Sequence, residues 1–367
     1  MTLERAVSGF LLLLSLPSGI VAAQGTTQPE KPKLAGNIFK NVQVLKDLPE
    51  QQFWETMSFF TDSLGVNCER CHETPFEADK KPEKIKARQM IRMVLDLNAR
   101  YFDGTRKVTC NSCHRGTTIP LDEPSLDAHR WMDFGRAEGP LPDGAALIAR
   151  YKRLTGVSAA AALHAERVSY EMTIYLSEAS PRRQNTELTI AAPDRFRMST
   201  RNDASTREWI RDGATGWTHD ADGWQAVDGS KMFDISSEAS SFKWENLKDV
   251  TDPKSLKMDM ARGRQATVVE ARDHGERVWL YFDNKTGLLL RRRAFSPSYF
   301  ADSCWDIEYD DYRRVGPVVL PYLVQILNPS GNGLTIRKVK ERALVRNLDA
   351  RLFAKPDGVA QNPVRSE

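Results

Sequence analysis

Apolar residues recur at helical spacing in a segment near the start of the chain. The segment opens with Asp47-Leu48-Pro49, and proline suits a first helical turn because its missing N–H leaves no bond unmade there. Gly65 suits the end of the helix. At i, i+4, i+7 and i+11 within the segment stand Phe53, Met57, Phe60 and Leu64. The pattern predicts one helix with a single apolar stripe.

Three more helices are predicted before residue 166. One covers residues 83–101, after the polar segment from Glu73 to Pro82. Its apolar face carries Met90, Met93, Val94 and Leu97. Asp143 can cap a short helix that ends at Gly156, and an alanine-rich stretch predicts another over residues 158–165.

From Arg167 onward the period of the pattern changes to two. Alternating runs such as residues 169–176, 195–198 and 278–282 are separated by turn residues, and residues 283–287 have the composition of a hairpin turn. About ten such strands without long helices between them predict one strongly curved antiparallel sheet. Tryptophans of this region are interpreted as core residues, namely Trp209, Trp217, Trp224, Trp244, Trp279 and Trp305.

The breaks in the pattern divide the chain into six parts. Residues 1–23 have the composition of an export signal: Arg5, an apolar run from Phe10 to Leu16, Pro17, and Val21-Ala22-Ala23 before a mature start at Gln24. The run is shorter than the roughly 20 residues that span a bilayer, and a retained anchor is the alternative. The other parts are a flexible tether (24–36), a helical domain (37–118), a linker (119–142), a β-rich domain (143–357) and a tail (358–367).

Composition and charge change this picture little. The 367 residues carry a formal charge of +3, and 28% are charged and 41% hydrophobic, as in an ordinary soluble protein. The charge pattern gives no indication of nucleic acid binding. His164, His219 and His274 are far apart in the sequence, and none has a nucleophilic residue at a spacing typical of a catalytic site. No hydrolytic site is therefore predicted.

The candidate chemistry lies in a five-residue pattern that occurs twice. Cys68-Glu69-Arg70-Cys71-His72 and Cys110-Asn111-Ser112-Cys113-His114 each place two thiols three positions apart, followed at once by an imidazole. Such thiols form thioethers with the vinyl groups of haem, and the histidine coordinates the iron. The pattern predicts two covalently attached haem c groups, with Cys68, Cys71, Cys110 and Cys113 as attachment sites and His72 and His114 as proximal iron ligands.

A four-cysteine zinc site is the alternative interpretation. Zinc ribbons separate their cysteine pairs by about 15 to 20 residues, whereas the first cysteines of the two pairs are 42 apart here. Export also agrees with haem, because c-type haem is attached outside the cytoplasm. The fifth cysteine, Cys304, is interpreted as a buried thiol.

Each haem also needs a sixth iron ligand. Met57 lies in the middle of the apolar stripe, eleven residues before Cys68, which lets its helix cross the open face of the first haem. The alternative is that Met57 is only a core residue. For the second haem, Met90 and Met93 lie about one turn apart, and their spacing does not separate them.

Further motifs surround the repeated pattern. They are residues 39–45, the Met57 helix, Leu64-Gly65-Val66, residues 87–90, Asn98 and residues 108–116. Together they resemble the cytochrome c subunit of photosynthetic reaction centres over residues 37–118. The resemblance implies His/Met ligation of both haems, with Met90 rather than Met93 as the second distal ligand because an Asn follows it by eight residues. The resemblance implies that Met93 is a packing residue. It also implies that the protein re-reduces an oxidised pigment centre from the periplasmic side.

The chain also departs from that family. Members with the full function resemble two such dihaem units in one chain, with four haems in all, whereas this chain has one unit. The histidine that serves a fourth haem is absent, and Gly104 lies near its place. The resemblance therefore carries the haem fold, and a role in photosynthesis does not follow from it.

Motifs in the β-rich half resemble a second family. They are Gly213-Ala214-Thr215-Gly216-Trp217, Leu280-Tyr281-Phe282-Asp283, Asp311-Tyr312-Arg313 and Val319-Leu320-Pro321. These are similar to periplasmic lipoprotein carrier and outer-membrane lipoprotein sorting proteins. The fold class expected is an α-helical dihaem cytochrome c domain followed by an antiparallel β half-barrel with short covering helices, α+β overall. The resemblance also implies an apolar concavity, and the alternative is a core that the tryptophans fill themselves.

These observations predict periplasmic electron transfer by two haem c groups in an electron carrier rather than an enzyme. The expected partners are a redox protein donor and acceptor, including membrane-bound ones, and an apolar ligand of the C-terminal domain is a further candidate. One alternative is a dihaem peroxidase, which needs an open sixth position on one iron. The other is a lipid or lipoprotein-binding protein with redox-sensing haems.

Overall fold

The computed structural model describes residues 32–120, 140–156, 165–176, 179–191, 194–227, 247–327, 333–346 and 348–359. The expected export signal, most of the linker, the expected helix over residues 158–165 apart from Ala165, His129, His164 and Trp244 lie outside these ranges. The described helices are α1 (Ala35–Ile38), α2 (Glu50–Leu64), the 3₁₀ turn η1 (Cys68–Arg70), α3 (Pro82–Tyr101), α4 (Cys110–His114), α5 (Gly144–Thr155) and the 3₁₀ turn η4 (Ala350–Phe353).

The strands form one antiparallel sheet. Thirteen strands are described, more than the ten or so that the pattern predicts. They are β1 (Ala165–Leu176), β2 (Ala179–Ala191), β3 (Arg195–Arg201), β4 (Thr206–Asp212), β5 (Thr215–Asp220), β6 (Gly223–Ala226), β7 (Val250–Ala261), β8 (Arg264–Asp273), β9 (Glu276–Asp283), β10 (Leu289–Pro297), β11 (Asp302–Val315), β12 (Val318–Leu327) and β13 (Leu334–Val345).

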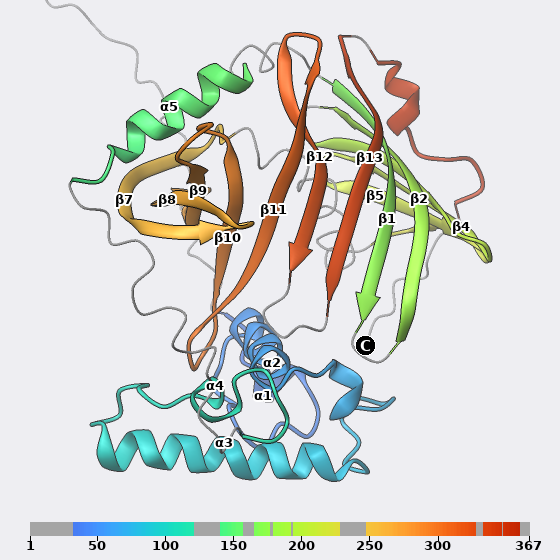
Figure 1. Ribbon diagram of the computed structural model, residues 1–367. Coiled ribbons are helices and arrows are strands. Elements are labelled where there is room, and N and C mark those ends of the chain that lie inside the picture. Colours follow the sequence, from blue (N-terminus) through green and yellow to red (C-terminus); the bar gives the residue numbers. More distant parts are fainter. Residues whose placement is uncertain are drawn as a thin grey trace, which may run out of the picture.

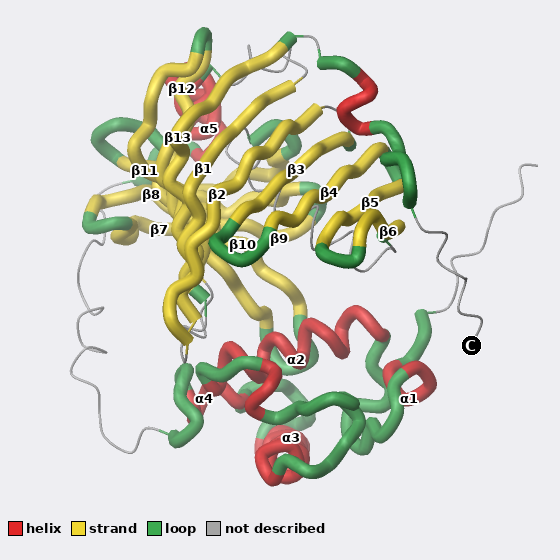
Figure 2. The backbone as a smooth tube through the Cα atoms, turned by 90° about the vertical axis from the view of Figure 1, so that its right-hand side faces the viewer, coloured by secondary structure: helices red, strands yellow, loops and turns green. Residues whose placement is uncertain are grey.

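Sheet order follows chain order except at the centre. The order is β6-β5-β4-β3-β2-β1-β13-β12-β11-β10-β9-β8-β7, so the first and last strands are paired and β6 and β7 form the two edges. The sheet is open and strongly curved (Figures 1 and 2). The predicted hairpin turn after β9 is confirmed: the Asp283 carboxylate accepts the backbone N–H groups of Lys285 and Thr286 at 2.8 and 3.1 Å.

Helix α5 covers one face of the sheet on the β7–β12 side. Its predicted cap is confirmed, because the Asp143 carboxylate accepts the backbone N–H of Ala146 at 2.8 Å. Gly156 ends the helix with φ 68°. Ile148 and Tyr151 are buried against the apolar side chains of β8 to β12. The opposite face, across β1 to β4, is covered by η4 through Phe353.

The described tryptophans do not form one core. Trp209 and Trp305 pack on the face that α5 shares, whereas Trp217, Trp224 and Trp279 pack with clusters on the other face. All five are half-buried. They therefore serve both surfaces of the sheet and do not line a single concavity.

Helices α1 to α4 form a separate layer below one end of the sheet (Figures 1 and 2). Ordered packing in this layer begins earlier than the predicted tether allows, since Leu34 pairs with Pro49 and Ala35 is fully buried. Helix α2 begins at Glu50 with Pro49 as its N-cap, one position later than the pattern suggests, and Gly65 ends it in the left-handed conformation as predicted.

The apolar stripe of α2 is not its most buried face. Phe53, Met57, Phe60 and Leu64 are half-buried, whereas the buried positions are Thr56, Phe59 and Ser63. Thr56 can be buried because its hydroxyl donates to the carbonyl of Gln52 at 2.6 Å. The predicted stripe therefore faces a region that the protein itself covers only in part.

Helix α3 buries a row that shares only Val94 with the predicted face. Buried are Lys84, Arg88, Ile91, Val94 and Asn98, a row that hydropathy alone does not reveal because three of its members are polar. Met90 and Leu97 are half-buried, and Met93 is 44% exposed. Among the described helices, none is long and apolar enough to cross a membrane.

Candidate functional site

Both cysteine motifs begin a capped helical turn. Asn67 precedes the first motif, and its side-chain oxygen accepts the backbone N–H of Arg70 at 3.2 Å. Thr109 precedes the second and forms a capping box with Ser112, which lies between the two cysteines. In the second motif, which lies wholly within α4, residues three and four apart share a face of the helix. In the first motif the 3₁₀ turn ends at Arg70, and the backbone N–H groups of Cys71 and His72 both donate to the carbonyl of Cys68, at 3.3 and 2.9 Å.

Each motif histidine uses the same ring nitrogen for a backbone contact. His72 Nδ1 lies 3.1 Å from the carbonyl oxygen of Phe76, and His114 Nδ1 lies 3.0 Å from that of Thr117. A carbonyl oxygen only accepts, so Nδ1 carries the proton and donates it. Nε2 then keeps the lone pair that binds a metal, which is the arrangement typical of ligating histidines.

The four motif cysteines are free thiols in pairs on separate turns. Burial raises the pKa of Cys110 to about 11, with a smaller contribution from Cys113. Burial also raises the pKa of Cys71, with Glu83 adding to the effect. Both thiols are therefore protonated near neutral pH. The fifth cysteine, Cys304, is half-buried rather than fully buried, and burial raises its pKa as well.

The three candidate methionines differ in exposure. Met57 on α2 and Met90 on α3 are half-buried, and Met93 is 44% exposed. The expectation that Met93 is a packing residue is therefore wrong. Half-exposed apolar side chains in this layer also include Phe76 and Trp54, exposed by 53% and 50%. Such a surface suits a flat apolar group more than water.

The loop after the first motif is braced from α3 by two buried cations. Lys84 Nζ donates to the carbonyls of Phe76 and Ala78, both at 2.8 Å. Arg88 donates to the Asp79 carboxylate at 2.8 Å. Hydrogen bonds from Arg88 and then Asn41 hold the pKa of Asp79 well below its usual range. The loop that supplies the carbonyl for His72 is thereby fixed to the helix.

The loop before the second motif is fixed by one side chain, Asn98. Its amide donates to the carbonyl of Val108 at 2.8 Å, and its oxygen accepts the backbone N–H groups of Lys107 and Val108 at 3.0 and 2.9 Å. Asn98 is 4% exposed. In the sequence Asn98 is only a marker of resemblance, whereas in the structure it holds the backbone just before Cys110.

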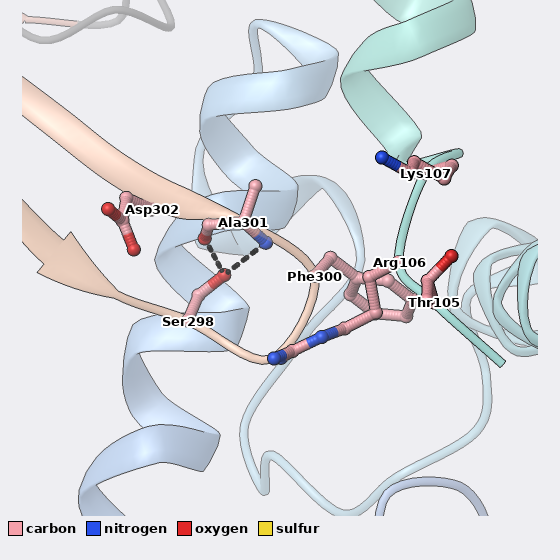
Figure 3. A pocket seen from close by; sticks show the side chains of 7 residues that line it. All are labelled: Thr105, Arg106, Lys107, Ser298, Phe300, Ala301 and Asp302. Atoms are coloured by element: carbon pink, nitrogen blue, oxygen red, sulfur yellow. Dashed lines mark hydrogen bonds between the residues drawn. The ribbon is translucent and has the colours of Figure 1, made fainter.

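The β10–β11 hairpin joins the helical layer to the sheet. Its tip residue Phe300 is 2% exposed and packs with Phe59 of α2 and Ile91 of α3, and Cys110 lies against the same cluster. The Tyr299 backbone N–H donates to the Thr56 hydroxyl at 3.1 Å. Beside this contact is a cavity of about 460 Å³ (Figure 3), lined by Thr105, Arg106, Lys107, Ser298, Phe300, Ala301 and Asp302. No sequence pattern indicated this contact.

The family model of the photosynthetic reaction centre cytochrome C subunit matches residues 15–133. Cytochrome c-554 of Chloroflexus aurantiacus is 38% identical over 89 residues, which are 22% of this chain and 22% of that protein. The photosynthetic reaction center cytochrome c subunit of Thermochromatium tepidum is 34% identical over 122 residues, 32% of this chain and 28% of that protein. The resemblance stated from the sequence motifs is confirmed, and the matched part spans about a quarter of these relatives.

Solved structures also align with the chain. The LolA superfamily protein of Nitrosomonas europaea aligns with a TM-score of 0.42 and 9% identity, covering 59% of this chain and 99% of that one. An outer membrane lipoprotein-sorting protein domain of Vibrio parahaemolyticus aligns with a TM-score of 0.38 and 12% identity, covering 57% and 95%.

The donor set fits haem c at both motifs. Each site offers two thiols and a histidine on one turn, with the imidazole tautomer set for coordination through Nε2. Cys68, Cys71 and His72 would hold one group, and Cys110, Cys113 and His114 the other.

Proposed function

We propose that this protein carries electrons in the periplasm by means of two covalently attached haem c groups. The observation that supports it most is the repeated geometry of the two motifs. Each has a capped turn, two thiols, and a histidine whose Nδ1 is committed to a backbone carbonyl. When bound, haem supplies a one-electron ferric/ferrous couple.

The chain's own residues hold and tune that couple. His72 and His114 are the proposed proximal ligands, and Met57 and Met90 the proposed distal ones. Both methionines lie half-buried on helices that precede their motifs. A thioether ligand raises the reduction potential relative to a second histidine, so such a protein suits donation of electrons to a strong oxidant.

We further propose that residues 37–118 are the electron-carrying domain and that residues 143–357 serve as its base for docking. Phe300 anchors the first on the second, and Ile148 and Tyr151 of α5 pack into one face of the sheet. The donor and acceptor are proposed to be redox proteins, and a cleaved export signal in residues 1–23 accounts for the periplasmic location.

Two measurements on the purified protein test this function. It should take up and return two electrons per chain reversibly. Its ferrous form should bind carbon monoxide only slowly, because Met57 and Met90 would already be bound to the two irons. A peroxidase would instead bind carbon monoxide or cyanide rapidly at one iron and consume peroxide with a reduced cytochrome as donor. That result would replace electron carriage by catalysis as the function.

A further inference from the structure

The two motif histidines donate to carbonyls in different electrostatic surroundings. The Phe76 carbonyl accepts from His72 Nδ1 at 3.1 Å and also from Lys84 Nζ at 2.8 Å. The Thr117 carbonyl accepts from His114 Nδ1 at 3.0 Å, and no ammonium group contacts it in the part of the chain that the structure describes. At the first site, therefore, the carbonyl oxygen of Phe76 is the one atom between the ammonium group of Lys84 and the ring of His72.

This cation is held firmly and is little screened by water. Lys84 is 8% exposed, and its Nζ also donates to the Ala78 carbonyl at 2.8 Å. The only carboxylate near it in the described contacts, that of Asp79, lies 3.4 Å from Nζ and is shared with Arg88 at 2.8 Å. Two buried cations thus share the one carboxylate that contacts them among the described residues.

We propose that Lys84 tunes the first haem site through the Phe76 carbonyl, raising the reduction potential there above that of the second site. This inference rests on the proposed function. A carbonyl that already accepts from an ammonium group is a weaker acceptor, so His72 keeps more of its Nδ1 proton and donates less charge to iron. The positive charge also disfavours the ferric state directly.

The two sites then differ in reduction potential, and electrons pass between them in one direction. The site of His72 is the one that holds an electron longer, and the site of His114, against the Phe300 cluster, passes its electron to it. Lys84 acts here as a positioning residue, since it touches the carbonyl that orients the ligand and not the iron.

Redox titration of the holoprotein tests this tuning. In Lys84→Met, one of the two midpoint potentials should fall, so that the ferrous-to-ferric ratio of that haem drops about tenfold at a fixed ambient potential, or ~59 mV for a one-electron couple. The other midpoint should not move. Lys86→Met, an exposed position two residues along the same helix, removes the same charge and should shift neither midpoint by more than a small fraction of this.

Two further variants separate tuning from loss of structure. Lys84→Gln keeps a donor for the Phe76 carbonyl without the charge and should give a smaller drop, and Lys84→Arg should restore most of the potential. In the ferrous protein the Nδ1 proton resonance of His72 should move downfield in Lys84→Met, while that of His114 stays in place. If Lys84→Met keeps both haems and its potentials and resonances do not change, the tuning role of Lys84 is overturned and the proposed electron transfer is not. Absence of the first haem from the native protein would overturn the proposed function.

Discussion

Met57, Met90 and Met93 have identical side chains and different surroundings. Sequence spacing could place all three on helices before the motifs, and it could not rank Met90 against Met93, because both lie on a plausible face of one helix. In the structure Met90 is half-buried and Met93 is 44% exposed, and the choice of Met90 as distal ligand stays a prediction.

Replacing the methionines tests the distal ligands. Met57→Ala and Met90→Ala should each abolish one component of the weak near-infrared sulfur-to-iron charge-transfer band of the ferric protein, and each should lower one midpoint potential because the thioether is lost. Met93→Ala is the matched control on the same helix and should leave the band intact with under about 0.5 kcal/mol of destabilisation. Loss of a band in Met93→Ala with none in Met90→Ala would reverse the assignment.

Asn98 is a buried polar residue whose structural role the sequence does not reveal. Its three side-chain hydrogen bonds hold residues 107 and 108, three and two positions before Cys110. Asn98→Ala should lower the free energy of unfolding by about 1–3 kcal/mol, because buried backbone groups lose their partners. It should also reduce attachment of haem at Cys110 and Cys113, measured by peptide mapping. Asn111→Ala, at an exposed position within the motif, is the control, and equal haem occupancy in both variants would contradict the account.

At the scale of elements, caps and turns were predictable and buried faces were not. Asp143, Gly65 and Gly156 mark helix ends as their chemistry requires, since a carboxylate satisfies free N–H groups and glycine tolerates positive φ. The buried row of α3 was missed because Lys84, Arg88 and Asn98 are buried through hydrogen bonds and ion pairs rather than apolar contact. Hydropathy does not register such partners.

The β10–β11 hairpin is the element that joins the two layers, so its tip can be tested directly. Phe300→Ala should cost about 3–5 kcal/mol, as expected for a buried aromatic side chain. It should also split thermal unfolding into two transitions, because the helical layer loses its anchor. Phe295→Ala, which removes a ring packed on Trp279 within the sheet at 5.1 Å, should leave a single transition. One shared transition in Phe300→Ala would show that other contacts couple the layers.

At the scale of the whole molecule, the hydrophobic pattern predicts the sheet but not its topology. Period-two runs predict an antiparallel sheet, but the pairing of β1 with β13 joins residues more than 150 positions apart, such as Ala165 and Val345. Local patterns contain no information on such pairing. The same holds for the contact between α2 and the hairpin, which brings Thr56 to Tyr299.

The contact between the layers should depend on pH through Glu55 of α2. Burial, then Glu276 and Asp62, raise the pKa of this carboxyl above its ordinary value of 4.5. The folded protein therefore binds the proton more tightly than the unfolded chain, and stability falls as pH rises from about 4.5 through the folded value. Glu55→Gln should gain no more than about 1 kcal/mol at pH 7, after solvent screening, and nothing at pH 4. Glu187→Gln, at an exposed position, should gain nothing at either pH.

The central claim is that each cysteine motif carries one covalently bound haem. Intact mass of the mature protein under denaturing conditions tests it most directly, because thioethers survive unfolding and acid extraction. The account predicts the polypeptide mass plus two haems, with one fewer haem attached or a weakened attachment in Cys71→Ser and in Cys113→Ser. A native protein carrying a single haem, or zinc in place of haem, would contradict it.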